Sequence, residues 1–276
     1  MKKEERLINK IKRLLKRLGC PRWLHHFGPK KYEFLEHLQA IFVMRYCRLS
    51  YRRIVKLFDL LGVRCPSKSA LHYNVKKISS AFWQKILKIT AGISHYLIAI
   101  DSTGFSRTNP SYYYLRRIDG KLPKIPVKMS AAFDTKRRKF CAAKIRVLPA
   151  HDINDAEFLV AKSKPKILVA DKGYDANWLH EYCAGKEIQT HIPIRKCNGK
   201  PRHKNFSARM NSAKAFRVRT YHRRELIEAG NSSIKRKFGA SVSSISARMI
   251  RAEIYGRLIC HNLFLFFFGL LGQSLC

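Results

Sequence analysis

Two short apolar runs, each closed by an aspartate, constrain the fold of this chain more than any other feature. The first runs from His95 to Asp101 and the second from Lys166 to Asp171. Unbroken apolar runs of this length are typical of strands that are covered on both faces of a sheet. A strand that ends in an acid places its carboxylate at the edge of the sheet, on a rigid support. If the two strands are neighbours, Asp101 and Asp171 converge.

The segments around these runs predict the rest of the sheet. A hairpin is expected over residues 127–134 and 140–148, followed by a helix at 154–163. After the second run, the pattern predicts a helix at 177–183 and a short strand at 188–193. This order of elements predicts an α/β fold, with a mixed sheet flanked by helices.

The charge of the chain bears on what the two aspartates do. The chain has 56 Lys and Arg against 18 Asp and Glu, a net charge of +38 that is spread along its length. Such a field attracts polyanions, so nucleic acid is the expected partner and an anionic membrane surface is the alternative. Asp101 and Asp171 repel each other unless a proton or cation lies between them. A divalent cation is the expected occupant, because oxygen ligands suit Mg²⁺ or Mn²⁺. The alternative is that Asp101 and Asp171 are two unrelated acids at the surface.

Asp175 precedes a predicted helix and is interpreted as its cap.

A third acid stands in a predicted helix that starts at Tyr221 and runs to Lys237. At about 100° per residue, its aromatic, basic and acidic members fall within roughly 60° of one another. These members are Tyr221, Arg224, Glu228 and Lys235. A solvated salt-bridge face is the alternative, and Glu225 is the second candidate for the acid. Gly230 and Asn231 lie in mid-helix, where their helix propensity is poor, so a break there would remove Lys235 from the stripe.

The N-terminal region, residues 1–92, is predicted to be helical and to bind DNA. Ser50 and Ser67 are placed to cap two short helices that flank a turn containing Gly62. A helix-turn-helix has this layout, although an ordinary helical hairpin has it too. In a helix-turn-helix, the exposed start of the second helix reaches base edges. The residues there are Lys68, Ser69, His72 and Tyr73.

Residues 104–126 interleave aromatic and basic side chains, including Tyr113, Arg116 and Arg117. Aromatic rings stack on bases and cations neutralise phosphates, so this segment is a second candidate for DNA contact. A solvated loop is the alternative reading of the same composition.

The most apolar run, residues 258–271, is too short and too polar to span a bilayer, and a buried helix is expected there. The chain has eight cysteines without a CxxC pair, and its charged N-terminus does not read as a signal peptide. We therefore expect a cytoplasmic, nucleoid-associated protein without membrane contact.

Together, three elements resemble the insertion-sequence transposases that have an RNase H-like DDE core. They are Asp101 after the first strand, the run Asp171-Lys-Gly-Tyr-Asp175, and a helix that matches Y-x2-R-x3-E-x6-K. The last pattern is met without a gap by Tyr221, Arg224, Glu228 and Lys235. The resemblance covers about residues 95–265 and identifies residues 93–276 as an RNase H-like catalytic domain with C-terminal helices. Asp171 and Glu228 are 57 positions apart, so a large β-rich insertion found in some members is absent.

The resemblance implies a transposase that cuts the ends of its insertion sequence and joins them to target DNA. Asp101, Asp171 and Glu228 would hold two Mg²⁺ (or Mn²⁺) ions for hydrolysis and then transesterification. Arg224 and Lys235 would grip phosphates and Tyr221 would stack or hydrogen-bond near the cleaved end. The expected partners are terminal inverted repeats, target DNA and a second copy of the chain, as a homodimer or larger assembly during synapsis. The alternatives are a catalytically silent DNA-binding protein derived from a transposase, and an RNase H-like nuclease that does not join strands.

Overall fold

The computed structural model of the chain divides into two compact units. It describes residues 9, 13, 16, 19–23, 31–92, 94–107, 112–117, 125–197, 200–201 and 206–269. One unit is formed by residues 1–90 together with 244–276, and the other by residues 91–243. The sequence predicts a boundary between residues 92 and 93 and places the last helices with the catalytic domain. In the structure, the last helix instead belongs to the unit of the N-terminal helices.

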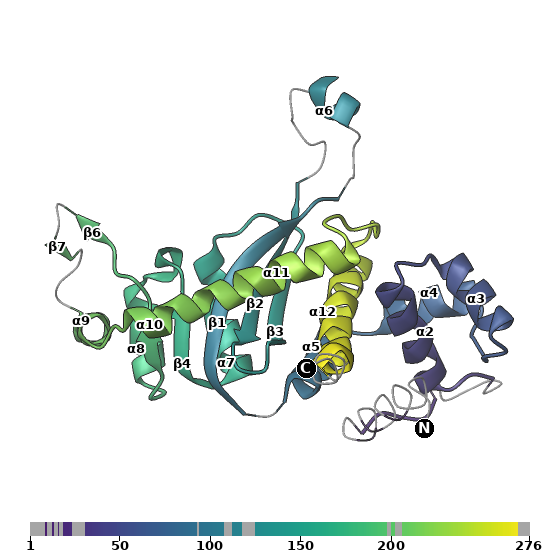
Figure 1. The fold of residues 1–276 in the computed structure, drawn as a ribbon, viewed down its shortest axis with the longest axis horizontal. Helices are drawn as coiled ribbons and strands as arrows, with labels where there is room; N and C mark the ends of the chain where they lie inside the picture. Colours follow the sequence, from purple (N-terminus) through teal and green to yellow (C-terminus); the bar gives the residue numbers. More distant parts are fainter. Residues whose placement is uncertain are drawn as a thin grey trace, which may run out of the picture. The chain divides into compact units, whose positions relative to one another are not determined.

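The unit of residues 91–243 is built on a five-stranded mixed sheet (Figure 1). The strand order is β3-β2-β1-β4-β5. β1 pairs antiparallel with β2 and β2 with β3, whereas β4 pairs parallel with β1 and β5 with β4. The strands are β1 (His95–Phe105), β2 (Val127–Asp134), β3 (Lys139–Arg146), β4 (Pro165–Ala170) and β5 (Gln189–His191). This arrangement confirms the expected mixed sheet of an α/β fold.

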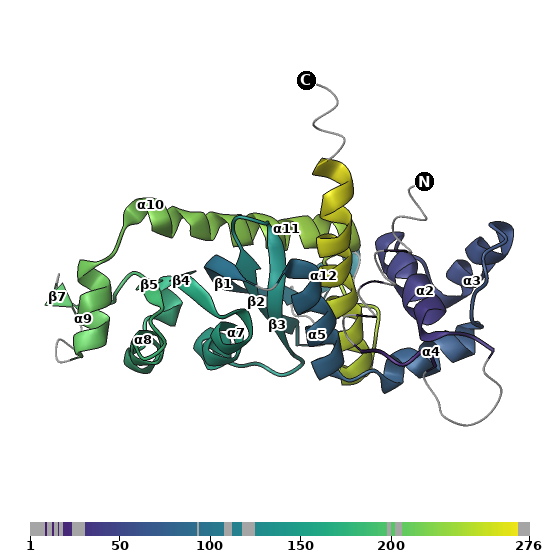
Figure 2. The ribbon, with the colours of Figure 1, turned by 90° about the horizontal axis from the view of Figure 1, so that it is seen from below.

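Helices cover both faces of this sheet, which explains the apolar runs of β1 and β4 (Figure 2). α7 (Ala156–Ser163) and α8 (Asn177–Ala184) lie on one face, preceded by the short turns η1 (Asp152–Asp155) and η2 (Lys172–Tyr174). The opposite face is crossed by α11 (Glu225–Phe238), which packs on β1 and β2. The segments before α11 are α9 (Ser207–Lys214), α10 (Val218–Tyr221) and η3 (His222–Arg224). Short elements elsewhere in this unit are α6 (Tyr112–Arg117), β6 (Lys196–Cys197) and β7 (Lys200–Pro201).

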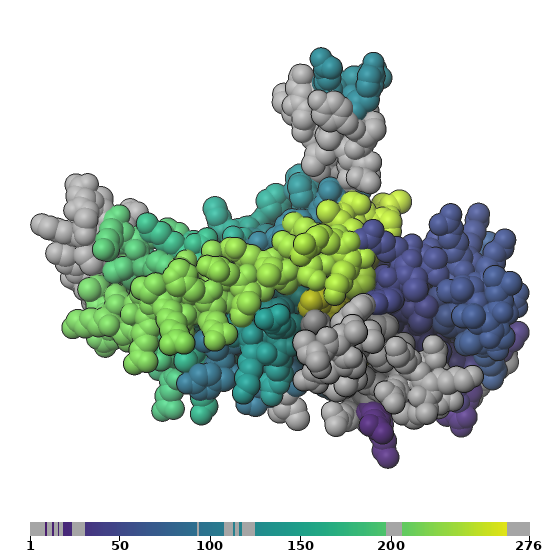
Figure 3. All heavy atoms as spheres, in the orientation of Figure 1, coloured from purple at the N-terminus to yellow at the C-terminus, as the bar shows by residue number. Residues whose placement is uncertain are grey.

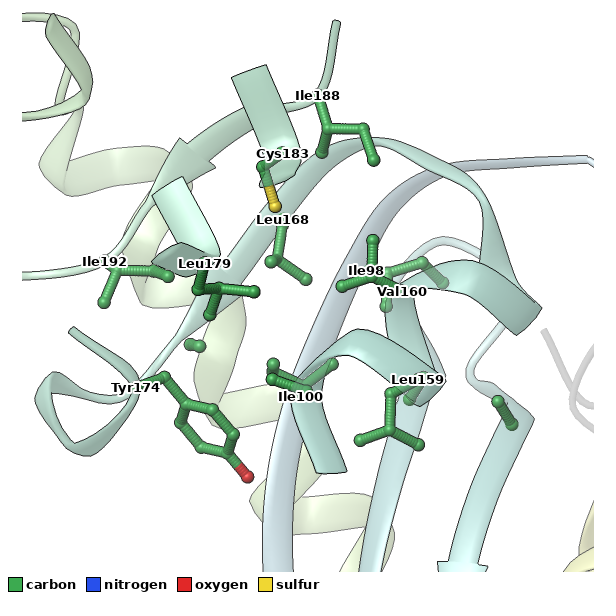
Figure 4. Close-up of a cluster of buried hydrophobic side chains, with 14 of the residues drawn as sticks. Ile98, Ile100, Leu159, Val160, Leu168, Tyr174, Leu179, Cys183, Ile188 and Ile192 are labelled. Atoms are coloured by element: carbon green, nitrogen blue, oxygen red, sulfur yellow. The ribbon is translucent and has the colours of Figure 1, made fainter. Parts of the chain in front are cut away.

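The main core lies between the sheet and the face made by α7 and α8 (Figure 4). Ile98 and Ile100 of β1 point into it, together with Leu168 of β4. Successive side chains of a strand point to opposite faces. Asp101, the residue after Ile100, is therefore directed to the face that α11 crosses.

Several boundaries differ by a few residues from those that the sequence predicts, and the differences in β1 and α11 bear on the site. β1 does not end at Asp101 but continues to Phe105, because residues 101–105 go on pairing with β2. Only the parallel pairing with β4 stops, at Ile100 and Ala170. The helix predicted at 221–237 has a 3₁₀ turn at its start and does not break at Gly230. Lys235 therefore stays on the same helix as Glu228.

The second unit is helical. It contains α2 (Phe34–Tyr46), α3 (Tyr51–Leu60), α4 (Lys68–Lys77), α5 (Ser80–Ala91) and α12 (Ala247–Gly269). The two predicted caps are confirmed, since Ser50 Oγ accepts a hydrogen bond from the backbone N–H of Arg53 and Ser67 Oγ from that of Ala70. α12 packs on α2 and α4 and has side chains buried as far as Leu263, which explains its place in this unit. Among the described residues, no helix is long and apolar enough to cross a membrane.

Candidate active site

Asp101 lies at the centre of the candidate site, half-buried on the face of the sheet that α11 crosses. Its Oδ2 accepts a hydrogen bond of 3.1 Å from Nδ2 of Asn231 on α11. Burial raises the pKa of Asp101 above its usual value, and the nearby Glu228 carboxylate adds to this effect. The backbone N–H of Ser102 and the Arg224 guanidinium act in the opposite direction without reversing the shift. The site therefore makes the ionised form of Asp101 costly in the absence of a further cation.

Asp171 follows β4 directly and is aligned with Asp101 by the register of the sheet. Ile100 pairs with Ala170, so the next residue on each parallel strand is one of the two acids. The backbone of Asp171 is still extended, with φ −67° and ψ 161°, so its side chain keeps the alternation of the strand. Its exposed carboxylate accepts a hydrogen bond from the backbone N–H of Lys172. At a strand spacing of roughly 4.8 Å, both acids start from neighbouring points on the α11 face.

Glu228 lies in the first turn of α11 and is half exposed. Its Oε1 forms an ion pair with Nη1 of Arg224, four positions earlier, and the Arg224 guanidinium lies 5.9 Å from the centroid of the Tyr221 ring. Glu225, the second candidate, instead faces His222 at 3.3 Å, and its side chain is 69% exposed. The Glu228 carboxylate lies close enough to Asp101 to raise its pKa, whereas Glu225 is turned toward His222, and this arrangement fits Glu228 as the partner of Asp101.

Lys235 lies two turns further along α11. Its Nζ is 5.7 Å from the centroid of the Phe105 ring, which is buried at the end of β1. Because α11 is unbroken, Glu228 and Lys235 lie on one helix that crosses the sheet, and Arg224 lies in the 3₁₀ turn directly before it. In the space-filling view, α11 forms a continuous ridge over this face (Figure 3).

The carboxylates of Asp101, Asp171 and Glu228 do not lie close enough together to bind one metal ion in the conformation observed. Within the described part of the chain, no three His, Cys, Asp or Glu side chains are grouped closely enough to hold a metal ion. Asp171 bonds to its own turn and Glu228 to Arg224, so both carboxylates must rotate to share an ion with Asp101. The donor set itself fits a hard divalent cation, since it consists of carboxylate oxygens on two adjacent strands and the helix above them.

Asp175 has a different role from the one predicted. It does not cap α8, whose N-cap is Ala176 without a side-chain bond. Its buried carboxylate instead accepts two hydrogen bonds from Arg209, at 2.7 and 2.6 Å, and one from the backbone N–H of Arg195 at 2.6 Å. His180 Nε2 lies 3.2 Å from the same carboxylate. The local sequence suggested a cap because these partners are distant in the chain.

A hydroxyl network on the core side of β1, next to Asp101, is not predicted by the sequence. Ser102 Oγ donates to Ser130 Oγ at 2.9 Å and lies 3.1 Å from the Tyr174 hydroxyl. Ser130 Oγ donates in turn to Asp155 at 2.8 Å, and Arg146 Nε donates to the other oxygen of Asp155 at 2.8 Å. The network joins β1, which carries Asp101, to the turn that follows Asp171. Its one sequence signal is that Ser102 lies two positions after Ile100 and so faces the core.

The residues predicted to read DNA from the N-terminal helices lie on α4 as expected. Lys68, Ser69, His72 and Tyr73 are all exposed. The Tyr73 ring lies under Lys77 Nζ at 4.2 Å. An exposed face of this kind is available to a ligand, but helical hairpins present similar faces.

The second predicted contact segment is described only in part. Tyr113 is 77% exposed on α6, and Arg116 and Arg117 are also exposed. Other basic members of the segment, Lys121 and Lys124, lie outside the described residues.

Comparison with known proteins bears on the identity of the sheet unit. A family model described as "Transposase DDE domain" matches residues 93–263. Among solved structures, the chain is similar to a "piggyBac transposase synaptic complex with hairpin DNA", with 10% sequence identity and a TM-score of 0.47. That likeness covers 98% of this chain and 73% of the other, and at such a TM-score it supports no conclusion about the site. No curated protein matches the chain.

Proposed function

Since the chain belongs to the family of transposases with a DDE domain, we propose that it cuts the ends of an insertion sequence and joins them to target DNA by metal-dependent phosphoryl transfer. The observation that carries this proposal is the placement of three acids around one face of the sheet. Asp101 and Asp171 stand side by side by register, and Glu228 acts on Asp101 from the helix above.

In this proposal, Asp101, Asp171 and Glu228 hold two Mg²⁺ or Mn²⁺ ions. Bound there, the ions supply an activated nucleophile at neutral pH and stabilise the leaving oxygen of an in-line displacement at phosphorus. The protein supplies ionised ligands on rigid supports. Asp101 comes from the middle of a strand, and because burial raises its pKa, a nearby cation would stabilise its charged form.

Arg224 and Lys235 are proposed to bind phosphates near the cleaved end, with Tyr221 beside them. The Arg224–Glu228 ion pair is half exposed on the glutamate side, and pairs of this kind are weak. Exchange of partners would therefore cost little: Glu228 would be able to hold a metal ion, and Arg224 would be able to bind a phosphate, with which a guanidinium forms strong bidentate hydrogen bonds.

The helical unit is proposed to recognise the ends of the element. Lys68, Ser69, His72 and Tyr73 on the exposed face of α4 would reach base edges as the second helix of a helix-turn-helix does. Tyr113, Arg116 and Arg117 on α6 would add contacts to the DNA backbone and to unstacked bases.

The test of the catalytic proposal uses the full chain, DNA that carries the flanking inverted repeats, and Mg²⁺. We expect Asp101→Asn, Asp171→Asn and Glu228→Gln to lose cleavage while they keep binding to the DNA ends. Glu225→Gln is the matched control on the same helix and should keep cleavage. Full cleavage by Glu228→Gln together with an inactive Glu225→Gln would reverse the choice of third acid. Cleavage by the wild type without strand joining would support a nuclease instead.

The test of end recognition uses point variants, because α12 packs with the N-terminal helices and a deletion of residues 1–90 would leave it without partners. Replacement of Lys68, His72 and Tyr73 by alanine should remove the preference for the cognate ends over unrelated DNA of equal length. An unchanged preference in a competition binding assay would refute the DNA-reading role of α4.

A further inference from the structure

The buried side of α11 contains a polar side chain, which is unusual in a hydrophobic core. The buried residues of this helix are Ile227, Gly230, Asn231, Ile234 and Phe238. Asn231 is the polar side chain among them and is 5% exposed. A buried amide is unfavourable unless it is hydrogen-bonded, and asparagine is also a poor helix former. A position that breaks two local preferences at once points to a functional reason.

Gly230 explains how Asn231 comes close to the sheet. A Cβ at position 230 would lie 3.0 Å from Cε2 of Phe133 and 3.2 Å from Cζ of Phe140. The missing side chain therefore allows the helix to approach the strands at this point. The next residue, Asn231, is brought within reach of the central strand β1.

The amide of Asn231 uses this approach to bind Asp101. Its Nδ2 donates to Asp101 Oδ2 at 3.1 Å, across 130 positions of sequence. Its Oδ1 is buried and has no hydrogen-bond partner among the described residues. The polar contact that compensates the burial of Asn231 is therefore its bond to the central acid of the site.

We propose that Asn231 is a positioning residue that orients the Asp101 carboxylate toward Glu228 and thereby sets the affinity of the acid site for a divalent cation. The inference rests on the proposed function of these acids. Asn231 and Glu228 are three positions apart on one helix, so a single rigid element carries both the third acid and the donor that holds the first. Residues that do not bind a metal ion themselves, but hydrogen-bond to its ligands, orient those ligands and thereby change the affinity for the metal.

The side chain of Asn231 is neutral, which leaves the charge of Asp101 to a metal ion. An arginine or lysine at this point would neutralise Asp101 and compete with a metal ion for it. A neutral amide N–H restricts the rotation of the carboxylate and leaves its charge available. Asp175, whose carboxylate is held by the Arg209 guanidinium at 2.7 and 2.6 Å, shows the opposite arrangement in the same unit.

The test measures Mn²⁺ binding to the full chain by electron paramagnetic resonance, without DNA. Asn231→Ala and Asn231→Leu should raise the Kd for Mn²⁺ by about 10- to 100-fold. Ser232→Ala, an exposed neighbour on the same helix, is the control and should stay within about twofold, as surface substitutions do. A Kd within the control range for both Asn231 variants would overturn the inference, as would a wild type that binds no Mn²⁺.

A double-mutant cycle separates positioning from a general effect on folding. In an Asp101→Asn background, Asn231→Ala should cause no further loss of Mn²⁺ affinity, because the carboxylate that it orients is gone. An equal loss in both backgrounds would show that Asn231 acts independently of Asp101 and would refute the inference.

Cleavage assays distinguish this inference from the proposed function. If both hold, the Mg²⁺ concentration for half-maximal cleavage rises in Asn231→Ala, and most of the rate returns at saturating Mg²⁺. If the wild type binds Mn²⁺ through Asn231-dependent ligands but never cleaves DNA, the proposed function fails and the inference stands. If the wild type cleaves and the Asn231 variants share its Mg²⁺ dependence, the inference fails alone.

Discussion

Asp171 and Asp175 stand four residues apart in one short run, yet their surroundings are opposite. Asp175 is buried and accepts hydrogen bonds from the Arg209 side chain and from the backbone N–H of Arg195. Although burial raises the pKa of Asp175, these donors outweigh it and hold the pKa well below its usual range. Asp171 is exposed and accepts a bond from the N–H of the next residue. Asp175 therefore already has its counter-charge, whereas Asp171 can still accept one.

The same contrast separates two regions of the sheet unit. Away from the α11 face, Asp134 and Asp155 are buried against basic side chains, 3.0 Å from Arg137 and 2.6 Å from Arg146. On the α11 face, Asp101 has a neutral amide instead. Carboxylates that are saturated by fixed cations stabilise the fold, whereas those left under-bonded are the ones that a mobile cation can use. Four changes test this division, from the largest expected effect to the smallest.

Asp175→Ala should be the most destabilising change. It leaves Arg209, whose side chain is 2% exposed, buried without its carboxylate, and breaking such a pair costs about 3–5 kcal/mol. The measurement is the free energy of unfolding in urea. Asp171→Ala is the matched control in the same run and should change that free energy by less than about 0.5 kcal/mol. Equal losses of unfolding free energy in the two variants would contradict the division between acids that stabilise the fold and acids of the site.

Asp134→Asn should remove the pH-dependent part of the stability that a saturated acid contributes. Burial raises the pKa of Asp134, but hydrogen bonds from His95 and Arg137 outweigh it and lower the pKa to about 2. A lowered pKa contributes stability above the unfolded value, near pH 4, which is lost as the pH falls toward 2. The wild type should therefore exceed Asp134→Asn by about 2 kcal/mol at neutral pH, and the gap should close between about pH 4 and pH 2. A gap that is constant with pH would point to packing instead of charge.

Tyr174→Phe tests the hydroxyl network that underlies the site. The change removes the hydroxyl that lies 3.1 Å from Ser102 Oγ and leaves the ring in the core. Loss of one such hydrogen bond should cost about 1 kcal/mol in urea unfolding. An unchanged free energy of unfolding would show that the hydrogen bond between Tyr174 and Ser102 does not stabilise the fold.

The sequence predicts those parts of the molecule that depend on neighbours in the chain. The two apolar strands and the hairpin follow from residue patterns only a few positions long. The caps at Ser50 and Ser67 are local as well, because each hydroxyl bonds to an N–H three residues on. Alternation along β1 also indicates that Asp101 and Ile100 face opposite sides.

The parts that the sequence does not predict depend on distant partners. The local sequence around Asp175 predicts a helix cap, but in the fold its partner is Arg209, 34 positions away in the chain. Asn231 looks like a weak point in a helix until Asp101 is brought to it across 130 positions. The last helix follows the sheet unit in sequence, but its apolar side packs on α2 and α4. In each case, the fold supplies a partner that no local pattern contains.

Asp101→Asn should have the smallest effect on stability and the opposite sign. Burial raises the pKa of Asp101, so the folded state binds a proton more tightly than the unfolded state does. Its ionised form therefore lowers stability as the pH rises above the unfolded value near 4. A neutral asparagine removes that penalty and keeps an oxygen that can accept the Asn231 bond, so we expect a gain on the order of 0.5 kcal/mol at neutral pH without metal. The measurement is urea unfolding with and without Mg²⁺. Added Mg²⁺ should stabilise the wild type and leave the variant unchanged, since a ligand stabilises only the state that binds it. A variant that is less stable than the wild type without metal would place Asp101 among the saturated acids and contradict the division.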